Sequence, residues 1–392
     1  MAPSRRRPRV SRSASPSNDD VLRPHQRRKS SRGNHSLSEL AKDICLFRKR
    51  VLFITGAGIS VASGVRPFRG SSGVWTTTIW TNATRDAFRK DPLKWYNDFW
   101  LPNLSLPQNV QSNAAHEALH KVLQRYPTTL SVITQNVDGL HPPSNRLIEA
   151  HGRIGLFKCM PDEDSDTDSD DDDDDERLVH LGHRRKRRLA MKKQACLYQQ
   201  KESLNVHQVE PARVRDVLDT GRGSISEPPK CPSCNNALAP QALLFDEGYH
   251  SHDFYQFQKM EEWLAKAEVI VFVGTSFAVR LPEIALEHAR AEHIPVYNFN
   301  TQDMLEATVR LNATNVKGPS EELLPRLLLE IQELETTLGI IPPGVAAKVK
   351  EAPAEGTQPP SSLRSQQVTN VSSPATTNAS RSSSLRAIRV KS

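Results

Sequence analysis

The stretch VLFITGAGIS, residues 51–60, sets the expectation for the fold. Its first five residues form an uninterrupted apolar run, which is typical of a strand buried on both faces of a parallel sheet. Gly56 and Gly58 follow at once, where a nucleotide-binding turn needs glycine to bring its backbone close to a phosphate. The usual dinucleotide fingerprint has a third glycine three residues later, where this chain has Val61. The turn alone therefore leaves a nucleotide site and an ordinary strand-to-helix turn both open.

The same alternation of strand and helix continues along the chain. Apolar runs predict strands at 130–134, 268–276 and 294–300, and apolar residues at helical spacing predict helices at 112–125, 254–267, 281–292 and 320–338. Ser112 is the expected N-cap of the first of these helices. The pattern indicates an α/β fold, with a Rossmann-like parallel sheet and helices on both faces. Ligands of such sheets bind at the carboxyl ends of the strands, where GAGIS, TQNVDGLH and GTSFAV lie in this sequence.

Composition separates a folded domain, predicted at residues 41–340, from segments that cannot fill a core. Residues 1–40 are rich in Arg and Ser, and residues 341–392 are rich in Ser, Thr, Pro and Ala. Within the domain, the segment 160–195 has 12 acids among the 15 residues 162–176. Low hydrophobicity cannot offset the entropy lost on ordering, so we expect all three segments to be disordered.

The net charge of +7 is distributed in blocks. The basic N-terminal tail and the run HRRKRRLAMKK at 183–193 favour nuclear import or contact with nucleic acid, with a solvated basic face as the alternative. We therefore expect a nuclear protein, with a cytoplasmic location as the alternative, and leave direct binding of nucleic acid open. The sequence has no apolar run of about 20 residues and no apolar segment after its basic start, which argues against membrane spanning and secretion.

Several short motifs follow one another in a fixed order: GAGIS, SG, FRG, GVW, TQNVDGLH, HG at 151–152, a Cys-x-x-Cys pair, GTS and VYNFN. Together they resemble the sirtuin family of NAD-dependent protein-lysine deacylases over about residues 45–335. The resemblance implies that NAD is a co-substrate and that the partner is an acetylated protein, for which histones are one candidate. It implies transfer of the acetyl group from lysine to ADP-ribose, with release of nicotinamide and O-acetyl-ADP-ribose.

The resemblance also implies roles for individual residues. His151 would be the general base that takes a proton from a ribose hydroxyl, and imidazole suits this step because its ordinary pKa is near physiological pH. Asn136 and Asp138 would join it as catalytic residues and, with Gln135, would contact the nicotinamide and ribose. The other implied cofactor contacts are Gly56, Ala57, Gly58, Arg69, Gly274, Thr275, Ser276 and Asn298.

The substrate side departs from the family pattern at two places. Pro67 replaces an acidic or hydroxyl residue near the nicotinamide pocket, and FDEGY replaces Phe-Gly-Glu in the segment 242–247, which would pair with the substrate backbone. The Tyr and Arg pair of succinyl-preferring sirtuins is not recognisable in PLKWYNDFW at 92–100, so acetyl is the expected acyl group. The alternatives are removal of longer acyl chains, mono-ADP-ribosyl transfer, or a scaffold that binds NAD with low activity.

Four of the five cysteines fit a structural zinc ion, which the family holds with two Cys-x-x-Cys pairs in a small module, about residues 151–240 here. CPSC at 231–234 is one pair, whereas the expected partner of Cys159 is replaced by Asp162. We predict that the segment 160–195 splits the first pair, because thiolates suit a closed tetrahedral zinc site. The predicted ligands are Cys159, Cys196, Cys231 and Cys234, and the alternative is three cysteines with Asp162 or His207. Cys45 is predicted to be a buried apolar side chain.

Overall fold

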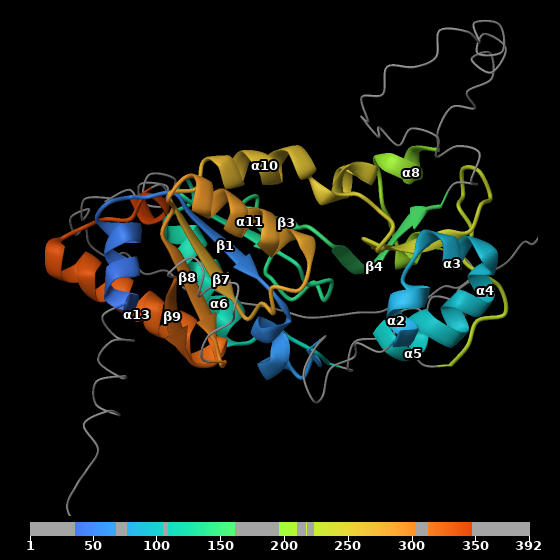
Figure 1. The fold of residues 1–392 in the computed structure, drawn as a ribbon, viewed down its shortest axis with the longest axis horizontal. Helices are drawn as coiled ribbons and strands as arrows, with labels where there is room; N and C mark the ends of the chain where they lie inside the picture. Colours follow the sequence, from blue (N-terminus) through green and yellow to red (C-terminus); the bar gives the residue numbers. More distant parts are fainter. Residues whose placement is uncertain are drawn as a thin grey trace, which may run out of the picture. The chain divides into compact units, whose positions relative to one another are not determined.

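A parallel sheet forms the centre of the larger part of the fold. The computed structural model describes residues 36–67, 77–104, 109–160, 196–209, 217, 223–302 and 313–346. Among these residues, six strands pair in the order β3-β2-β1-β7-β8-β9 (Figure 1). They are β1 Val51–Thr55, β2 Leu130–Thr134, β3 Leu147–Glu149, β7 Val269–Val273, β8 Val296–Asn300 and β9 Thr314–Lys317. All neighbours are parallel, and the order is that of dinucleotide-binding sheets, so the predicted Rossmann-like architecture is confirmed.

Helices cover both faces of this sheet. Successive side chains of a strand point to opposite faces, so Val51 and Phe53 join one core while Leu52 and Ile54 join the other. The first core is closed by α6 Ala114–Arg125, α13 Ser320–Leu338 and a helix at residues 36–45. The second is closed by α10 Phe257–Ala265 and α11 Arg280–Ala291. Burial on both faces explains why the strand sequences are apolar without alternation.

The predicted limits of the folded domain were wrong by a few residues at each end. Residues 36–40 are helical, because Leu37, Leu40 and Ile44 recur at helical spacing and are fully buried. Residues 343–346 form a helical turn against α6, where a Cβ atom at Gly344 would lie 1.7 Å from the Gln124 carbonyl oxygen. Of the segments predicted to be disordered, residues 1–35, 161–195 and 347–392 lie outside the described residues, and Met160 is buried.

The cap predicted for α6 was also wrong. Asn113 is the N-cap: its Oδ1 accepts a hydrogen bond from Ala115 N at 2.9 Å, and its own N–H donates to His116 Nδ1 at 3.3 Å. Ser112 instead donates its hydroxyl to the backbone oxygen of Leu140. The cap lies one residue later because the Ser112 hydroxyl has a tertiary partner, which residue spacing does not reveal.

A second core lies beside the sheet and contains a small antiparallel sheet with the order β5-β4-β6. Its strands are β4 Gly152–Cys159, β5 Leu204–Asn205 and β6 Leu238–Ala242, accompanied by α8 Leu197–Gln200 and η5 Val206–Gln208. Packed with them are α2 Thr77–Asn82, α3 Arg85–Lys90, α4 Pro92–Trp95, the π-helical η2 Tyr96–Trp100 and α5 Leu101–Leu104. Sequence analysis did not associate the segment 77–104 with this module. Trp95 stands at its centre and makes edge or stacking contacts with four other aromatic rings.

Three 3-10 helices complete the elements near the site: η1 Ala57–Ser63, η6 Tyr249–Ser251 and η7 Asp253–Tyr255. The predicted helix 254–267 is divided into η7 and α10, because Gln256 between them has a left-handed φ of 50°. Residues 242–255 therefore form a connected run of turns from the small sheet to the helices of the large one.

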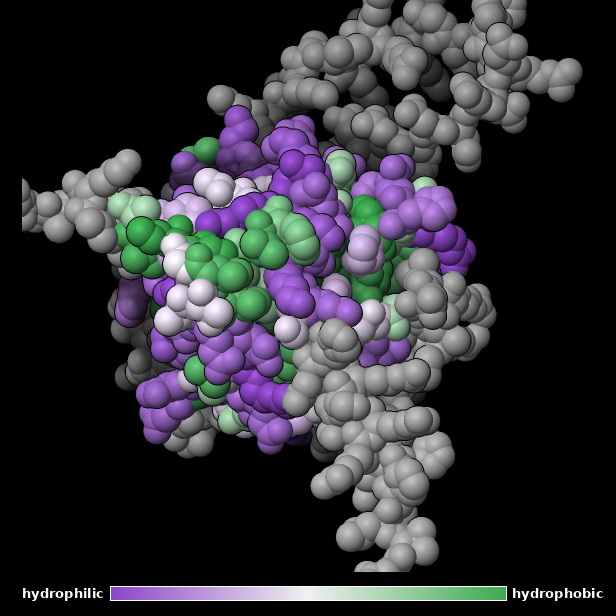
Figure 2. Space-filling view, turned by 90° about the vertical axis from the view of Figure 1, so that its left-hand side faces the viewer, coloured by the Kyte–Doolittle hydropathy of each residue, from purple (hydrophilic) through white to green (hydrophobic). Residues whose placement is uncertain are grey.

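Apolar side chains also lie at the surface of the end that carries α13. Figure 2 faces this end and shows hydrophobic residues between polar ones. The exposed large hydrophobic residues of α13 and of its neighbouring segments are Leu46, Phe47, Leu329, Leu338 and Ile341. In the part of the chain that the structure describes, no helix combines the length and the apolar character that crossing a bilayer requires.

Candidate active site

Two glycine-containing turns touch at the carboxyl ends of β1 and β7. A Cβ atom at Gly58 would lie 2.5 Å from Gly274 Cα, and one at Gly56 would lie 2.9 Å from Gly274 O. Gly274 also has a φ of 59°, in the left-handed region that favours glycine. The chain turns to opposite sides of the sheet at these two strands, and nucleotides bind at such a reversal point. Glycine is therefore required by backbone contact where a nucleotide would be held.

The end of β2 brings two amide side chains to the same place. Gln135 and Asn136 are both buried. Gln135 Nε2 donates to Thr275 Oγ1 and to the Thr55 backbone oxygen, each at 3.3 Å. Asn136 Nδ2 donates to the Gly56 backbone oxygen at 3.2 Å. The two amides therefore connect β2 to both glycine turns.

Asp138 contacts the Asn136 amide indirectly, through the Ser60 hydroxyl. Its Oδ2 accepts a hydrogen bond from the Ser60 hydroxyl at 2.7 Å, and Ser60 Oγ in turn accepts from Asn136 Nδ2 at 3.1 Å. These two hydrogen bonds fix the orientation of the Asn136 amide. The Oδ1 atom of Asn136 is buried and has no hydrogen-bond partner among the described residues. Buried acceptors are rarely left unpaired, so this oxygen is available to a donor on a ligand.

His151 lies in the turn between β3 and β4. Gly152 follows with a φ of 92°, and a Cβ atom there would lie 1.8 Å from the Gln241 carbonyl oxygen, which explains the His-Gly pair. The imidazole Nε2 is 3.1 Å from the Tyr249 hydroxyl. Burial lowers the pKa of His151 to about 4, against a smaller raising effect of a hydrogen bond to the Gln135 backbone. The imidazole is therefore neutral near pH 7 and can accept a proton.

A cavity of about 840 Å³ joins these groups. It extends from the glycine turns past His151 to the second core, where Ile79, Ala83 and Trp100 line it. The predicted cofactor contacts that line it are Gly56, Ala57, Gly58, Gln135, Asn136, Gly274, Thr275 and Ser276. Pro67 lines it as well, whereas Asp138 does not, and Arg69 lies outside the described residues. A pocket of this size, mostly apolar with a few converging polar groups, is typical of a ligand site.

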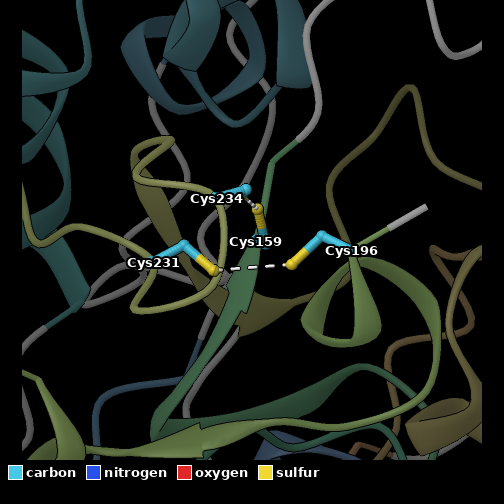
Figure 3. Close-up of side chains that lie close together, drawn as sticks. All are labelled: Cys159, Cys196, Cys231 and Cys234. Carbon is cyan, nitrogen blue, oxygen red and sulfur yellow. Dashed lines mark hydrogen bonds between the residues drawn. The ribbon is translucent and has the colours of Figure 1, made fainter. Parts of the chain in front are cut away.

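The four cysteines that were predicted to act together lie together in the second core. Their sulfur atoms are all within 4.8 Å of one another, with Cys159–Cys234 at 3.3 Å and Cys196–Cys231 at 3.5 Å (Figure 3). A zinc–sulfur bond of about 2.3 Å places the sulfurs of a tetrahedral site about 3.8 Å apart. The set therefore fits a structural zinc ion in both chemistry and spacing.

The alternative ligands do not join this cluster among the described residues. His207 is exposed and is not part of the group, and Asp162 lies outside the described residues. Cys45 is 1% exposed in the core between the large sheet and its helices, as predicted. Burial raises the pKa of Cys159 and of Cys231, which disfavours the thiolate form that binds a metal. The charge of a bound dication would offset this effect.

Comparison with known proteins agrees with this geometry. A sequence model of the Sir2 family matches residues 56–281, more than half of the chain. The chain belongs to the Sir2 family. The NAD-dependent deacetylase sir2E of Dictyostelium discoideum is 34% identical over 303 residues, which are 75% of this chain and 76% of the relative. An NAD-dependent protein deacylase of Pyrococcus abyssi is 30% identical over 294 residues, 73% of this chain and 94% of the relative.

Solved Sir2 structures share the fold. A Sir2 homologue in complex with NAD superposes with a TM-score of 0.53 at 22% identity, covering 76% of this chain and 94% of the homologue. A structure from work on the mechanism and regulation of Sir2 enzymes gives 0.54 at 20% identity, covering 78% and 99%. The sirtuin resemblance of the motifs and the expected fold are thus confirmed.

The implied cofactor contact Asn298 does not line the cavity of this Sir2 protein, whereas Asn300, two residues later, does. Asn298 is 1% exposed, donates to Asn315 Oδ1 at 2.8 Å and does not line the cavity. Asn300 lines it and donates to the Thr275 backbone oxygen at 2.9 Å. Both residues point to the same face of β8, but Asn300 is the last residue of the strand and so lies nearer the binding edge. Its place at the strand end was the signal in the sequence.

The predicted substrate segment of the Sir2 protein already uses several backbone donors. Leu243 N donates to the His151 backbone oxygen and Phe245 N to the Ala83 oxygen, each at 2.9 Å. Leu244 N donates to Glu247 Oε2 at 3.0 Å. The segment therefore offers a substrate backbone its carbonyl groups rather than these three N–H groups, which limits the expected strand addition.

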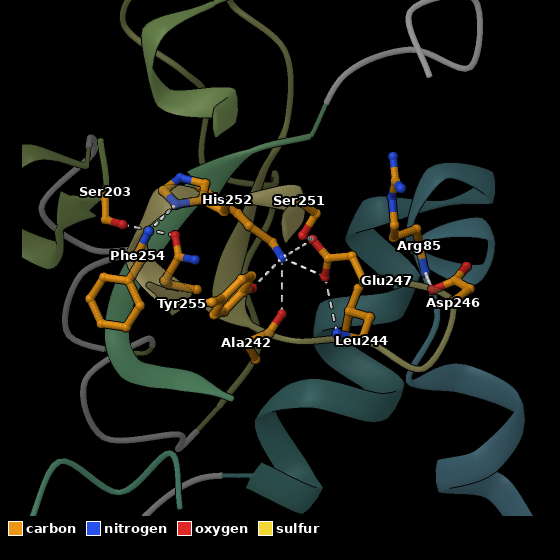
Figure 4. A network of polar contacts seen from close by, with 12 residues as sticks. Arg85, Ser203, Ala242, Leu244, Asp246, Glu247, Ser251, His252, Phe254 and Tyr255 are labelled. Atoms are coloured by element: carbon orange, nitrogen blue, oxygen red, sulfur yellow. Dashed lines mark hydrogen bonds and ion pairs between the residues drawn. The ribbon is translucent and has the colours of Figure 1, made fainter. Parts of the chain in front are cut away.

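A buried ion pair holds this segment against the small sheet. Lys158 Nζ bonds both Glu247 carboxylate oxygens at 2.6 Å, the Ala242 backbone oxygen at 3.0 Å and the Tyr255 hydroxyl at 2.9 Å. The lysine and glutamate side chains are 3% and 5% exposed. Figure 4 shows Glu247 also contacting Leu244 and Ser251. The pair thus ties the cavity wall to the strand residue that precedes a proposed zinc ligand.

Sequence reasoning missed several residues that structure brings to the site of this Sir2 protein. Ser60 follows the glycine turn and Tyr249 stands in the unusual FDEGY sequence, so both had a visible signal. Lys158 had a weaker one, a charged residue directly before Cys159 in a strand. Their partners are far apart in the chain, and only the fold reveals them.

Proposed function

We propose that this protein is an NAD-dependent protein-lysine deacetylase, which transfers an acetyl group from lysine to ADP-ribose and releases nicotinamide and O-acetyl-ADP-ribose. The observation that carries the proposal is the cavity, which joins the glycine turns of a nucleotide-binding sheet to a neutral, partly buried imidazole. The relative named as an NAD-dependent deacetylase supports the same reaction.

The roles proposed for the glycine turns and for Asn136 follow from their geometry. Both turns leave no room for a Cβ atom, which suits backbone contact with the pyrophosphate of NAD. The unpaired Asn136 Oδ1 would accept a hydrogen bond from the nicotinamide amide or a ribose hydroxyl. The other proposed NAD contacts are Ala57, Arg69, Gln135, Thr275, Ser276 and Asn300.

His151 is the proposed general base. Bound NAD would supply an ADP-ribosyl group whose bond to nicotinamide breaks during the reaction. His151 lines the cavity, and its neutral Nε2 atom would take the proton of a ribose hydroxyl. Asp138 would act through Ser60 by fixing the Asn136 amide. With these assignments the base and the two amides line the same cavity.

The four-cysteine cluster is the proposed structural zinc site of the small module. Four thiolates leave no open coordination position, which is typical of zinc that stabilises a fold and does no chemistry. Much of the module's folding free energy would then come from metal binding.

A longer acyl group is a second candidate substrate, favoured by one observation. The cavity wall contributed by the second core is apolar, with Ile79, Ala83, Trp100 and Leu244, and the exposed Phe245 lies beside Leu244 in the sequence and also lines the cavity. Such a wall would bind the alkyl chain of an acyl group without a charged terminus. It offers no described partner for a terminal carboxylate, so succinyl is not proposed.

We further propose a nuclear location and a chromatin substrate, such as an acetylated histone. The proposal is supported by the basic runs at the N-terminus and at 183–193. A fluorescent fusion with and without the run 183–193 tests the location: exclusion of the intact chain from nuclei would refute it.

The reaction is tested with a panel of acyl-lysine peptides and NAD, following nicotinamide and O-acyl-ADP-ribose. We expect NAD-dependent release of both from the acetyl peptide. His151→Ala should abolish turnover and leave NAD binding largely intact, because the imidazole acts after the cofactor is seated. Near-normal turnover of this variant would show that the assigned base is wrong, and absence of any product from the native chain would refute the deacylase proposal.

A further inference from the structure

The phenol of Tyr249 contacts the imidazole of His151 in two ways. Its hydroxyl is 3.1 Å from Nε2, and the two rings are stacked at 21° with centroids 5.9 Å apart. Phe257 also stacks on the Tyr249 ring, with an interplanar angle of 4° and centroids 6.2 Å apart. The phenol also lines the cavity. Tyr249 is therefore held at the base nitrogen by ring contacts with His151 and Phe257.

The direction of the hydrogen bond between the two rings follows from their other partners. A neutral imidazole has one N–H donor and one acceptor nitrogen. The bond between His151 and the Gln135 backbone raises the imidazole pKa, so the carbonyl of Gln135 accepts the imidazole N–H. Nε2 is then the acceptor, and the Tyr249 hydroxyl is the donor.

The Tyr249 oxygen has a second partner that agrees with this direction. A hydrogen bond from the Leu281 backbone lowers the phenol pKa, so the oxygen accepts the Leu281 N–H at the start of α11. Burial has the larger effect and raises the pKa of Tyr249 to about 12, with Arg280 as the charged side chain that acts on it. The phenol therefore keeps its proton near neutral pH and has His151 as the partner for it.

We infer that Tyr249 is a positioning residue for the His151 base: its hydroxyl favours the tautomer with an unprotonated Nε2, and it occupies that nitrogen until a ribose hydroxyl replaces it. The inference rests on the proposed role of His151. Because the bond stabilises the neutral imidazole, Tyr249 also keeps the base unprotonated at mildly acidic pH. The chain of bonds runs from the Leu281 N–H through Tyr249 and His151 to the Gln135 carbonyl.

Tyr249→Phe tests this inference, since it keeps the stacked ring and removes the hydroxyl. We expect the His151 pKa, measured by NMR titration of labelled histidine in the full chain, to rise by about 0.5–1 unit. The acid limb of the pH profile of kcat should move to higher pH by the same amount. KM for NAD and for peptide should change little, because the phenylalanine ring fills the same space. Tyr297→Phe is the matched control, a buried phenol on β8, and should leave the His151 titration unchanged.

The outcomes separate this inference from the proposed function. An unchanged His151 titration in Tyr249→Phe, or a native His151 protonated on Nε2 at pH 7, would overturn the positioning role whatever the activity. Full activity of His151→Ala would instead remove the proposed base, while the titration shift of Tyr249→Phe would still stand.

Discussion

Lys158→Met should destabilise the protein strongly and weaken peptide binding. The substitution leaves the Glu247 carboxylate 5% exposed, with the Leu244 N–H and the Ser251 hydroxyl as its remaining donors. Removing one partner of a buried ion pair costs about 3–5 kcal/mol, and the two surviving hydrogen bonds favour the lower end, about 3 kcal/mol. At about 2–4 °C per kcal/mol, thermal denaturation should show Tm lowered by about 6–12 °C. KM for the acetyl peptide should rise more than KM for NAD, because Ala242 and Leu244 line the cavity and belong to the segment 242–247 that is expected to contact the substrate.

Lys266→Met is the matched control, since Lys266 pairs with Glu262 at 2.5 Å but both side chains are more than half exposed. It should leave Tm within error of the native value, because solvent screens such a pair. The double variant Lys158→Met with Glu247→Leu should recover much of the loss, as it removes both buried charges. Equal Tm values for the two lysine variants would refute the reasoning that burial makes this ion pair matter.

Three further predictions concern the metal site, the glycine turns and pH. Cys196→Ser should lower zinc content and Tm about as much as Cys231→Ser, and Cys45→Ser is the control that should leave both unchanged. Metal analysis that finds zinc intact in Cys196→Ser would contradict the four-cysteine site. Gly58→Ala should weaken NAD binding at least about tenfold in calorimetry. The new Cβ atom would lie 2.5 Å from Gly274 Cα, so the two glycine turns that would hold the nucleotide must separate. Native affinity for NAD would argue against close contact of these turns at the nucleotide site. Burial lowers the pKa of His141 to about 3 and that of His252 to about 4, so the unfolded chain binds more protons below about pH 6.5 and stability should fall steadily from there toward pH 4. Thermal melts at a series of pH values check this, and a Tm that does not change between pH 7 and 5 would count against it.

The elements that sequence predicted well are those whose pattern is complete within one segment. The runs at 51–55 and 130–134 coincide with β1 and β2, because each apolar run ends abruptly at a glycine or polar residue. The helix at 320–338 coincides with α13, whose nineteen residues carry a long apolar stripe. Burial on both sides of the sheet was therefore readable before the fold was known.

The elements that were missed depend on tertiary contacts. The helices α3 and α4 have six and four residues, too short to be stable alone, and their aromatic side chains are ordered by the second core. At the site, the motifs supplied Gln135, Asn136, His151 and the cysteines, but not the links between them. Ser60, Tyr249 and Lys158 act on partners 76 to 98 positions away, a separation that no local pattern spans.

The meeting of Cys159 and Cys196 has a consequence for how this chain can change over time. Their sulfur atoms lie within 4.8 Å, although 36 residues separate them in the sequence. A pair of metal ligands at the two ends fixes the points of entry and exit, and each doubling of the intervening length adds only about 0.6 kcal/mol to the entropy of closure. Evolution can therefore lengthen, shorten or recode this stretch without a compensating change in the cavity. A protein engineer could use the same junction to graft a reporter or a targeting sequence onto the working enzyme.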